Sequence, residues 1–356
     1  MDLAPTAGQQ AIQDQARRFL ATEITRERRL AWDATPEGHD GAFWKAVAEL
    51  GWFGFALPEA SGGQGASVLE LGLLLEECGR AVAPLAIFAA IAGGLGLDAL
   101  GTEEQRRDWL ASLGCGERMV TLAVAERSAV SEPAAFETVL SRRGDALRLD
   151  GEKRFVLQGV TADAFLVAAR DSGGVSVVLV PATTAGVRVA PSSTFAKDRQ
   201  STVRLDGVSL PSTALCARPG DAWSALEKLH RTLAALLCAD LIGGADAVLE
   251  TTVRYVGERE QFGAKLGTFQ AVQQMAAAMA IDLEGARHLT RQALRIMRAD
   301  FQETTWKACW ETVAQGRPAA EVAAELGVTV GAVYAARFRV LDRLRHEVRD
   351  AGLTCL

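Results

Sequence analysis

The residues best suited to chemistry lie in one short stretch, residues 255–273. An arginine, three glutamines and two phenylalanines gather there around Gly263: Arg259, Gln261, Phe262, Phe269, Gln270 and Gln273. A guanidinium group is a planar fork of hydrogen-bond donors that suits a diphosphate, and a glutamine amide both donates and accepts. Core packing alone explains such a cluster poorly. The pattern therefore indicates a ligand contact, and its alternative is a surface arginine beside two packed helices.

Hydrophobic periodicity separates the elements that must position this cluster. Residues 1–117 and 218–300 place apolar side chains three or four apart, which predicts helices, and two long helices flank a turn at 263–268. Residues 118–217 carry five short β-rich runs separated by turn signals, which predicts a small antiparallel sandwich or barrel. We therefore predict a multi-domain α+β fold. Its N-terminal helical domain, β domain and truncated C-terminal helical bundle precede a small domain at 301–350.

Composition places the chain among ordinary globular proteins. The 356 residues are 49% apolar and 23% charged, and the net charge of -6 argues against whole-chain binding to nucleic acid or an anionic membrane. Six scattered cysteines and four scattered histidines form neither a disulfide framework nor a zinc site, so we expect reduced thiols, a cytoplasmic protein and no bound metal. No secretory signal is visible, and interruptions in the apolar run 81–100 favour a buried helix pair over a membrane span.

Motifs along residues 1–300 resemble those of the acyl-CoA dehydrogenase family. Gly-Trp-Phe-Gly at 51–54 and Leu-Asp-Gly-x-Lys-x-Phe-Val at 149–156 resemble its N-terminal loop and β-domain hairpin, and the Arg-x-Gln-Phe-Gly segment that begins at Arg259 is the most specific match. The resemblance implies that FAD lies between the β domain and the C-terminal helices, with an acyl-CoA thioester beside the flavin ring. It also implies that a glutamate removes the α-proton while hydride leaves the β-carbon for the flavin, in a tetramer built from dimers.

The resemblance implies cofactor contacts in two parts of the chain. Arg259 would reach the FAD pyrophosphate of a neighbouring subunit, Phe262 would pack near the cofactor, and Gln270 would hydrogen-bond it. In the β domain, Phe155 would stack beside the flavin ring. Leu157 stands where the family has a threonine, so its backbone amide is the donor that is left.

The loop at 125–132 departs from the family's pattern. Glu126, Ala129 and Ser131 match a loop whose backbone and hydroxyl groups contact FAD, which makes Ser131 a candidate cofactor contact. Val130 replaces a glycine, and a β-branched residue does not readily adopt the backbone angles open to glycine. Normal and altered flavin binding therefore both stay open for this loop.

The family's catalytic glutamate has no counterpart in this sequence. Most members carry it in the final third of the C-terminal helical domain, which the resemblance does not cover, and a minority carry it at the position of Leu233. Glu227 lies about two turns away and is expected to face solvent, and Asp240 is expected to make a helix-capping or inter-helix hydrogen bond. We therefore predict no catalytic residue, because a base must reach the proton that it removes. The chain resembles the shorter subunit of heteromeric enzymes, which needs a base-bearing partner; an electron-transfer flavoprotein is a candidate electron acceptor.

Residues 301–356 follow a different pattern. Ala323, Gly327, Val330 and Val333 have the spacing of a helix-turn-helix. The zone resembles the promoter-binding C-terminal domain of extracytoplasmic-function sigma factors, in which the second helix enters the major groove of DNA. The resemblance makes three arginines candidate DNA contacts: Arg337, Arg339 and Arg343.

Three functional hypotheses follow. The first, which we favour, is an FAD-binding subunit for the α,β-dehydrogenation of an acyl-CoA substrate; whether it acts as an oxidoreductase without a partner stays open. The second is a DNA-binding regulator with an acyl-CoA dehydrogenase-like sensor part. The third is a non-functional fusion of two partial genes, because the pattern changes abruptly at 300–301 without a linker.

Overall fold

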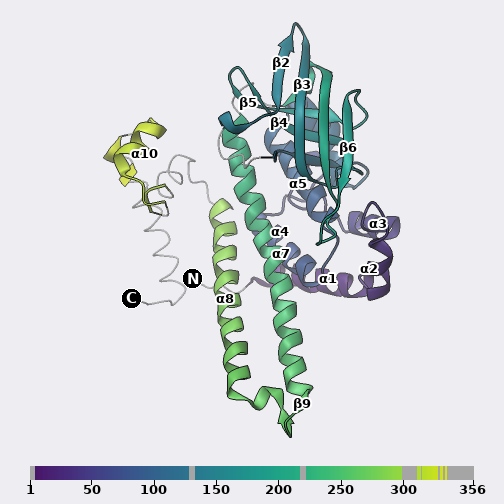
Figure 1. Ribbon diagram of the computed structural model, residues 1–356, viewed down its shortest axis with the longest axis vertical. Coiled ribbons are helices and arrows are strands. Elements are labelled where there is room, and N and C mark those ends of the chain that lie inside the picture. The colour runs from purple at the N-terminus through teal and green to yellow at the C-terminus, as the bar shows by residue number, and fades with distance from the viewer. Residues whose placement is uncertain are drawn as a thin grey trace. The chain divides into compact units, whose positions relative to one another are not determined.

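The computed structural model of this chain (Figure 1) divides into two compact units. The larger unit is Ala11–Leu294, and the smaller one joins Met1–Gln10 to Arg295–Leu356. The structure describes residues 5–127, 133–216, 222–298, 311–313, 315–327, 329–331 and 333–334.

The N-terminal part of the described chain is helical, as predicted. A capping box begins the last of these helices: the Thr102 hydroxyl accepts from the Gln105 amide at 3.2 Å, and the Thr102 amide donates to Gln105 Oε1 at 3.0 Å. The apolar run 81–100 is buried, as predicted, but it lies mostly in the single helix α5 and not in a pair of helices. The elements are α1 (Ala7–Glu23), α2 (Arg26–Trp32), α3 (Gly41–Glu49), η1 (Glu59–Ser61), α4 (Val68–Arg80), α5 (Ala86–Leu100) and α6 (Glu103–Gly114).

The middle part forms one eight-stranded sheet, in the order β6-β7-β3-β2-β4-β5-β8, with β1 beside β4. Most pairs are antiparallel, but β1 and β2 both run parallel to β4, so the sheet is mixed rather than antiparallel as predicted. Residues 124–163 separate these two strands, so their pairing leaves no local turn signal in the sequence. The strands are β1 (Val120–Ala123), β2 (Val139–Arg143), β3 (Ala146–Leu157), β4 (Ala164–Asp171), β5 (Gly174–Pro181), β6 (Val187–Ser192), β7 (Gln200–Pro211) and β8 (Leu215–Cys216).

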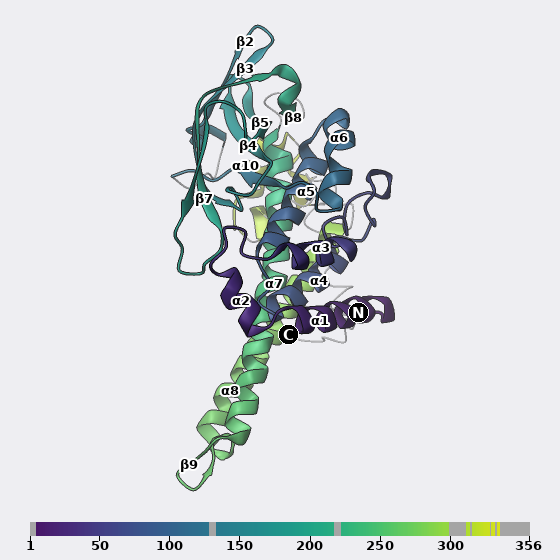
Figure 2. The same cartoon turned by 90° about the vertical axis from the view of Figure 1, so that its right-hand side faces the viewer.

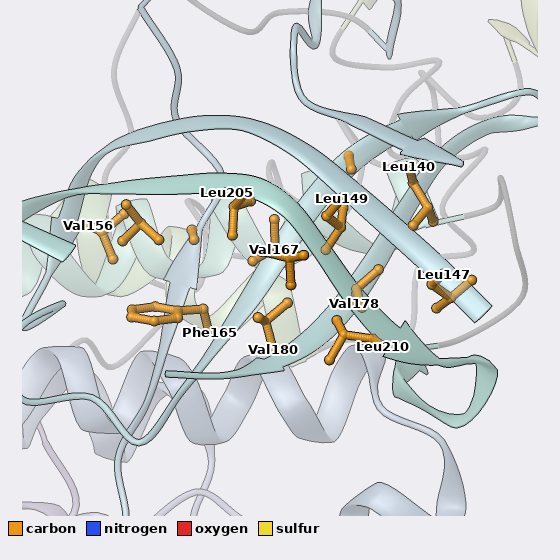
Figure 3. Close-up of a cluster of buried hydrophobic side chains, with 14 of the residues drawn as sticks. Leu140, Leu147, Leu149, Val156, Phe165, Val167, Val178, Val180, Leu205 and Leu210 are labelled. Carbon is orange, nitrogen blue, oxygen red and sulfur yellow. The ribbon is translucent and has the colours of Figure 1, made fainter. Parts of the chain in front are cut away.

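The sheet curls around its own apolar core (Figure 3). Leu149 of β3 and Leu205 of β7 lie in the same buried cluster as Val167 of β4 and Val180 of β5, although β7 and β5 lie far apart in the strand order. Inward and outward residues alternate along β3 and β7, as expected for strands with one buried face. This rigid core carries the strand ends that concern function.

Two long helices follow the sheet: α7 (Ala222–Glu258) and α8 (Gln270–Arg298). A small hairpin and a turn connect them, made of β9 (Glu260–Gln261), β10 (Ala264–Lys265) and η4 (Leu266–Thr268). By length and composition α7 could cross a membrane, but this is weak evidence, since core helices of soluble proteins pass the same test. In the larger unit α7 packs along α4.

Glycines set the close approach of α4 and α7. A Cβ atom on Gly79 of α4 would lie 1.7 Å from the Asp240 carbonyl oxygen, and one on Gly243 of α7 would lie 1.7 Å from the Glu76 carbonyl oxygen. No side chain fits at such distances. Gly79 and Gly243 therefore allow the backbones of α4 and α7 to approach this closely.

Buried ion pairs attach α8 to α4. Glu76, which is almost fully buried, accepts from Arg287 at 2.7 Å and from Arg291 at 3.1 Å. Arg287 also donates to Asp246 of α7 at 2.8 Å. These contacts link α4, α7 and α8 by charge as well as by packing.

The described part of the smaller unit contains α10 (Ala319–Leu326), which ends at Gly327 in the left-handed region with φ 63°. Val322, Ala323 and Val333 form a small buried cluster. Ala323, Gly327 and Val333 are three of the four positions that form the helix-turn-helix pattern in the sequence. A complete helix-turn-helix domain is not established by them and stays a prediction.

Candidate functional site

The tip of the α7–α8 hairpin carries the arginine–glutamine cluster. Gln261 pairs with Ala264 across the two turn residues, Phe262 and Gly263, which have φ values of 56° and 73°. Positive φ at both turn residues defines a type I′ β-turn, which matches the twist of antiparallel strands. The sequence predicted a turn at 263–268; the structure starts it one residue earlier and adds the 3-10 turn η4.

Phe262 is the most unusual residue of this tip. It is 93% exposed, and its backbone lies in the left-handed region, which costs a non-glycine residue about 1 kcal/mol or more. Its ring meets the edge of the Phe269 ring at a centroid distance of 6.4 Å. The fold thus holds a large aromatic side chain in a strained and solvated position, which suits contact with something outside this chain.

Arg259 and Gln270 are exposed at the same tip. The Arg259 backbone is fixed, because its amide donates to the Tyr255 carbonyl and its carbonyl accepts from the Leu266 amide, both at 2.8 Å. Within the described residues the structure gives the Arg259 guanidinium no ion pair. Gln273 has a structural role, since its Nε2 donates to the Gly267 carbonyl at 2.9 Å and braces η4.

The second group of predicted residues lies at the end of β3. The register between β3 and β7 shifts between Lys153 and Val156, and inside this bulge Phe155 has φ 56° and a 62% exposed ring. The carbonyl of Leu157 accepts from the Thr121 hydroxyl at 2.7 Å. The Leu157 carbonyl is therefore engaged by its own domain, while Phe155 projects its ring into solvent.

A buried ion pair lies behind Phe155. Lys153 Nζ donates to Glu126 Oε1 at 2.5 Å and to the Val124 carbonyl at 3.2 Å. Burial lowers the pKa of Lys153 to about 8, against the opposing effect of Glu126. Burial acts to raise the pKa of Glu126, but hydrogen bonds from Lys153 and Thr138 outweigh it and lower that pKa. The sequence analysis missed this pair, although an inward lysine in step with Leu147 and Leu149 along β3 was a usable signal.

The two groups do not meet within one chain. Trp223, in the first turn of α7, packs edge-to-face on Phe136 of the β domain at 6.1 Å, so the start of α7 lies against that domain. Arg259 follows the other end of this 37-residue helix, which is about 55 Å long at 1.5 Å per residue. Figures 1 and 2 show the hairpin tip at β9 far from the sheet. Each chain therefore offers two separate half-sites.

The described part of α7 brings no carboxylate to the position of the family's base. Leu233 is buried there, and Glu227 is half-buried rather than fully solvated. Asp240 lies at the contact with α4, where burial raises its pKa to about 6. The hydrogen bond expected for Asp240 is not found among the described residues. Four other candidates lie outside the described residues: Ser131, Arg337, Arg339 and Arg343.

A helical domain, a β domain and a helical hairpin define a class of multi-domain α+β proteins, and this chain carries exposed aromatic and cationic groups on two of those parts. Comparison identifies the class. Models of the acyl-CoA dehydrogenase N-terminal, middle and C-terminal domains match residues 6–117, 121–208 and 224–337. The chain is 31% identical over 303 residues to benzylmalonyl-CoA dehydrogenase of Aromatoleum aromaticum, which covers 82% of this chain and 80% of that protein.

Other relatives agree. The probable acyl-CoA dehydrogenase YngJ of Bacillus subtilis is 28% identical over 309 residues, with the same shares covered. Among solved structures, the Tcur3481-Tcur3483 steroid ACAD G363A variant is 28% identical with a TM-score of 0.75, covering 98% of this chain and 99% of that one. The ChsE4-ChsE5 complex from Mycobacterium tuberculosis is 25% identical with a TM-score of 0.77 over the whole of both chains. This chain belongs to the acyl-CoA dehydrogenase family, whose members are FAD-dependent flavoproteins.

Proposed function

We propose that this chain is a subunit of an acyl-CoA dehydrogenase-like flavoprotein in which two chains share each FAD. Phe155 and Leu157 of one chain face the flavin ring, and Arg259, Phe262 and Gln270 of another chain hold the rest of the cofactor. The observation that carries this proposal is the separation of the two half-sites by the length of α7. A single chain cannot close such a site, but an oligomer can, because symmetry places the tip of one chain against the sheet of its neighbour.

The residues present fit FAD in part. Arg259 offers a planar cation to the diphosphate, and the exposed rings of Phe155 and Phe262 offer aromatic faces to the cofactor. Leu157 lacks the hydroxyl donor of the family pattern, so its backbone amide is left for hydrogen bonding to the ring. When bound, FAD supplies the acceptor for the hydride. The residues of this chain orient the ring, bind the phosphates and exclude water.

The missing base supports a subunit that relies on a partner. Removal of the α-proton needs a carboxylate within hydrogen-bond reach of the substrate carbon. Leu233 fills the α7 position with a buried apolar side chain, and Asp240 lies between α7 and α4. One similar structure is named as the ChsE4-ChsE5 complex, that is, as an assembly of two different chains. We infer that a base-bearing acyl-CoA dehydrogenase subunit completes the reaction, in the cytoplasm, with an electron-transfer flavoprotein as the acceptor.

Exposed apolar side chains on α7 and α8 support assembly. Large aliphatic residues and methionines of both helices are more than half exposed in the single chain, which is unusual for a monomer with a folded core. Burying them in an interface would remove this apolar area from water and stabilise the assembly. The most exposed are Leu241, Val248, Met275, Ile281 and Leu289.

A mixing experiment tests the shared site. Arg259→Met damages the hairpin half-site and Phe155→Ala damages the sheet half-site, so each variant purified alone should lack flavin absorbance. Co-expressed in equal amounts, they should recover about a quarter of the wild-type flavin, because half of the dimers are mixed and each mixed dimer has one intact site of two. The matched control is Arg254→Met, an exposed arginine near the same end of α7, which should keep wild-type flavin. No recovery on mixing refutes sharing between copies, and recovery with a base-bearing partner alone assigns the second half-site to that partner.

DNA binding by the smaller unit is a second candidate function. Its support is the left-handed Gly327 turn after α10 and the small core of Val322, Ala323 and Val333. If it holds, a defined duplex should be bound with a steep dependence on salt, and acyl-CoA should change the affinity. Binding that ignores both sequence and acyl-CoA rules out the regulator, and a protein without flavin or duplex binding supports the non-functional fusion.

A further inference from the structure

The buried pair of Lys153 and Glu126 lies at the joint between two segments of the β domain. The Lys153 side chain is 0% exposed and that of Glu126 is 1% exposed. Lys153 Nζ also lies 4.7 Å from the centroid of the Phe136 ring, a cation–π contact. Such complete burial of two charges is expensive unless their partners are well placed. Lys153 lies two residues before Phe155, where the register shift begins, so the buried pair bears on the Phe155 backbone.

The pair fixes residues 124–126 against residues 153–155. Lys153 holds the Val124 carbonyl, and the Arg154 amide donates to the Ala125 carbonyl at 2.9 Å. Glu126 in turn accepts from the amides of Glu137 and Thr138, at 2.5 Å and 3.0 Å. One carboxylate therefore gathers a lysine and two backbone amides from separate segments. Residues 124–126, which follow β1, are therefore held against the bulge.

The backbone at the bulge needs such support. Phe155 occupies the left-handed region, where an L-residue is strained and relaxes unless its surroundings prevent it. Exposure of its ring leaves little packing of its own to hold that conformation. On the preceding residues, the network of Lys153, Glu126 and the Arg154 amide adds to the pairing of β3 with β7.

We propose that Lys153 and Glu126 are positioning residues that hold the Phe155 ring and the neighbouring segment 124–126 in the geometry that binds the flavin ring. The inference rests on the proposed function, since it concerns the same half-site. Neither side chain touches the cofactor, because both are buried. They act through the backbone of the bulge, so their loss should loosen the grip on the ring while leaving the remote hairpin tip unchanged.

The decisive variant is the double substitution Lys153→Met with Glu126→Gln in the complete flavin-loaded assembly. It leaves no unpaired buried charge. The single oxygen of the glutamine still accepts from one of the two amides that Glu126 binds through separate oxygens, so the variant loses one buried hydrogen bond and we expect it to fold. The single variant Lys153→Met leaves the buried Glu126 carboxylate without its counter-charge and is the harsher test. The matched control is Arg148→Met, which removes an exposed ion pair with Asp150 on the same strand.

The readouts are the dissociation constant for FAD, the visible spectrum of the bound flavin and the unfolding midpoint of the flavin-free protein. We expect the double variant to bind FAD about tenfold more weakly, because the Phe155 ring is still present but is no longer held in place. Its flavin spectrum should be altered, and its midpoint should fall only by the cost of one buried hydrogen bond. Arg148→Met should match wild type in all three. A folded double variant with wild-type FAD affinity and spectrum overturns the proposal, and a lower midpoint without weaker binding reduces the pair to a purely structural role. If the wild-type protein binds no FAD, the proposed function fails first and is recognised by that result alone.

Discussion

Relief of the strain at Phe262 should stabilise the hairpin tip and weaken cofactor binding together. Phe262→Asn creates the turn sequence that type I′ hairpins prefer, because asparagine tolerates positive φ and precedes Gly263. Removal of a strained non-glycine conformation gains about 1 kcal/mol. Loss of the exposed edge contact with Phe269 costs about 0.5 kcal/mol, since the ring is 93% exposed and buries little area. The balance favours the variant by about 0.5 kcal/mol.

Amide hydrogen exchange in the flavin-free protein measures this local gain. The Leu266 amide, which donates to the Arg259 carbonyl across the hairpin at 2.8 Å, reports opening of the tip. A gain of about 0.5 kcal/mol slows its exchange roughly twofold. The opposite control is Gly263→Ala, which places an alanine at φ 73° and should speed exchange. Unchanged or faster exchange in Phe262→Asn refutes the assignment of strain, and unchanged FAD affinity refutes the role of the ring in cofactor contact.

Three further predictions concern α4, α7 and α8. Gly79→Ala should destabilise the protein by about 2 kcal/mol or more, because its Cβ would collide with the Asp240 carbonyl. Gly257→Ala, on the exposed part of α7, should instead stabilise it by about 0.5–1 kcal/mol. Chemical denaturation measures both variants, and equal effects contradict the close helix contact. Glu76→Gln should cost about 3 kcal/mol, since Arg291 loses its buried counter-charge and Arg287 keeps only its pair with Asp246. A midpoint within error of wild type contradicts this. The pKa of Asp240 is raised by burial to about 6, so its stabilising contribution is full below about pH 4 and is lost as pH rises through 6. Asp240→Asn should therefore increase the free energy of unfolding by about 2 kcal/mol at pH 7 and flatten its pH profile between pH 4 and 6. A profile parallel to that of wild type refutes this prediction.

Local patterns predicted much of the fold. The buried apolar run of α5 and the two long helices around the turn near Gly263 depend on neighbours along the chain, and both are found in the structure. The pairing of β1 with β4 could not be predicted in this way, because parallel strands are joined by a long crossover that carries no turn signal. The bulge at Phe155 could not be predicted for a similar reason. A shift in register depends on the facing strand β7, and hydrophobic periodicity along β3 does not show that strand.

Prediction of the candidate site from the sequence has the same limit. Motif spacing identified Arg259, Phe262 and Phe155 as candidate contacts, but did not show that Gln273 braces η4. Nor does motif spacing reveal the Lys153–Glu126 pair, since the Leu-Asp-Gly-x-Lys match at Lys153 says nothing about the burial of its charge. A lysine on the inward side of a strand can stay only where a carboxylate meets it, so period-two alternation implies a partner even when it cannot name one.

Backbone strain gives an independent argument for an assembly. Among the described residues, Phe155 and Phe262 are the two aromatic side chains with left-handed backbones, and both are mostly exposed. A strained residue normally persists because its surroundings stabilise it, yet each ring meets little of its own chain. One ring lies on the sheet and the other at the tip of the hairpin, on either side of the α7 span. Both strained and solvated rings are explained together if they meet across a subunit interface. Contact with a planar cofactor between them would then offset the strain energy of each backbone conformation.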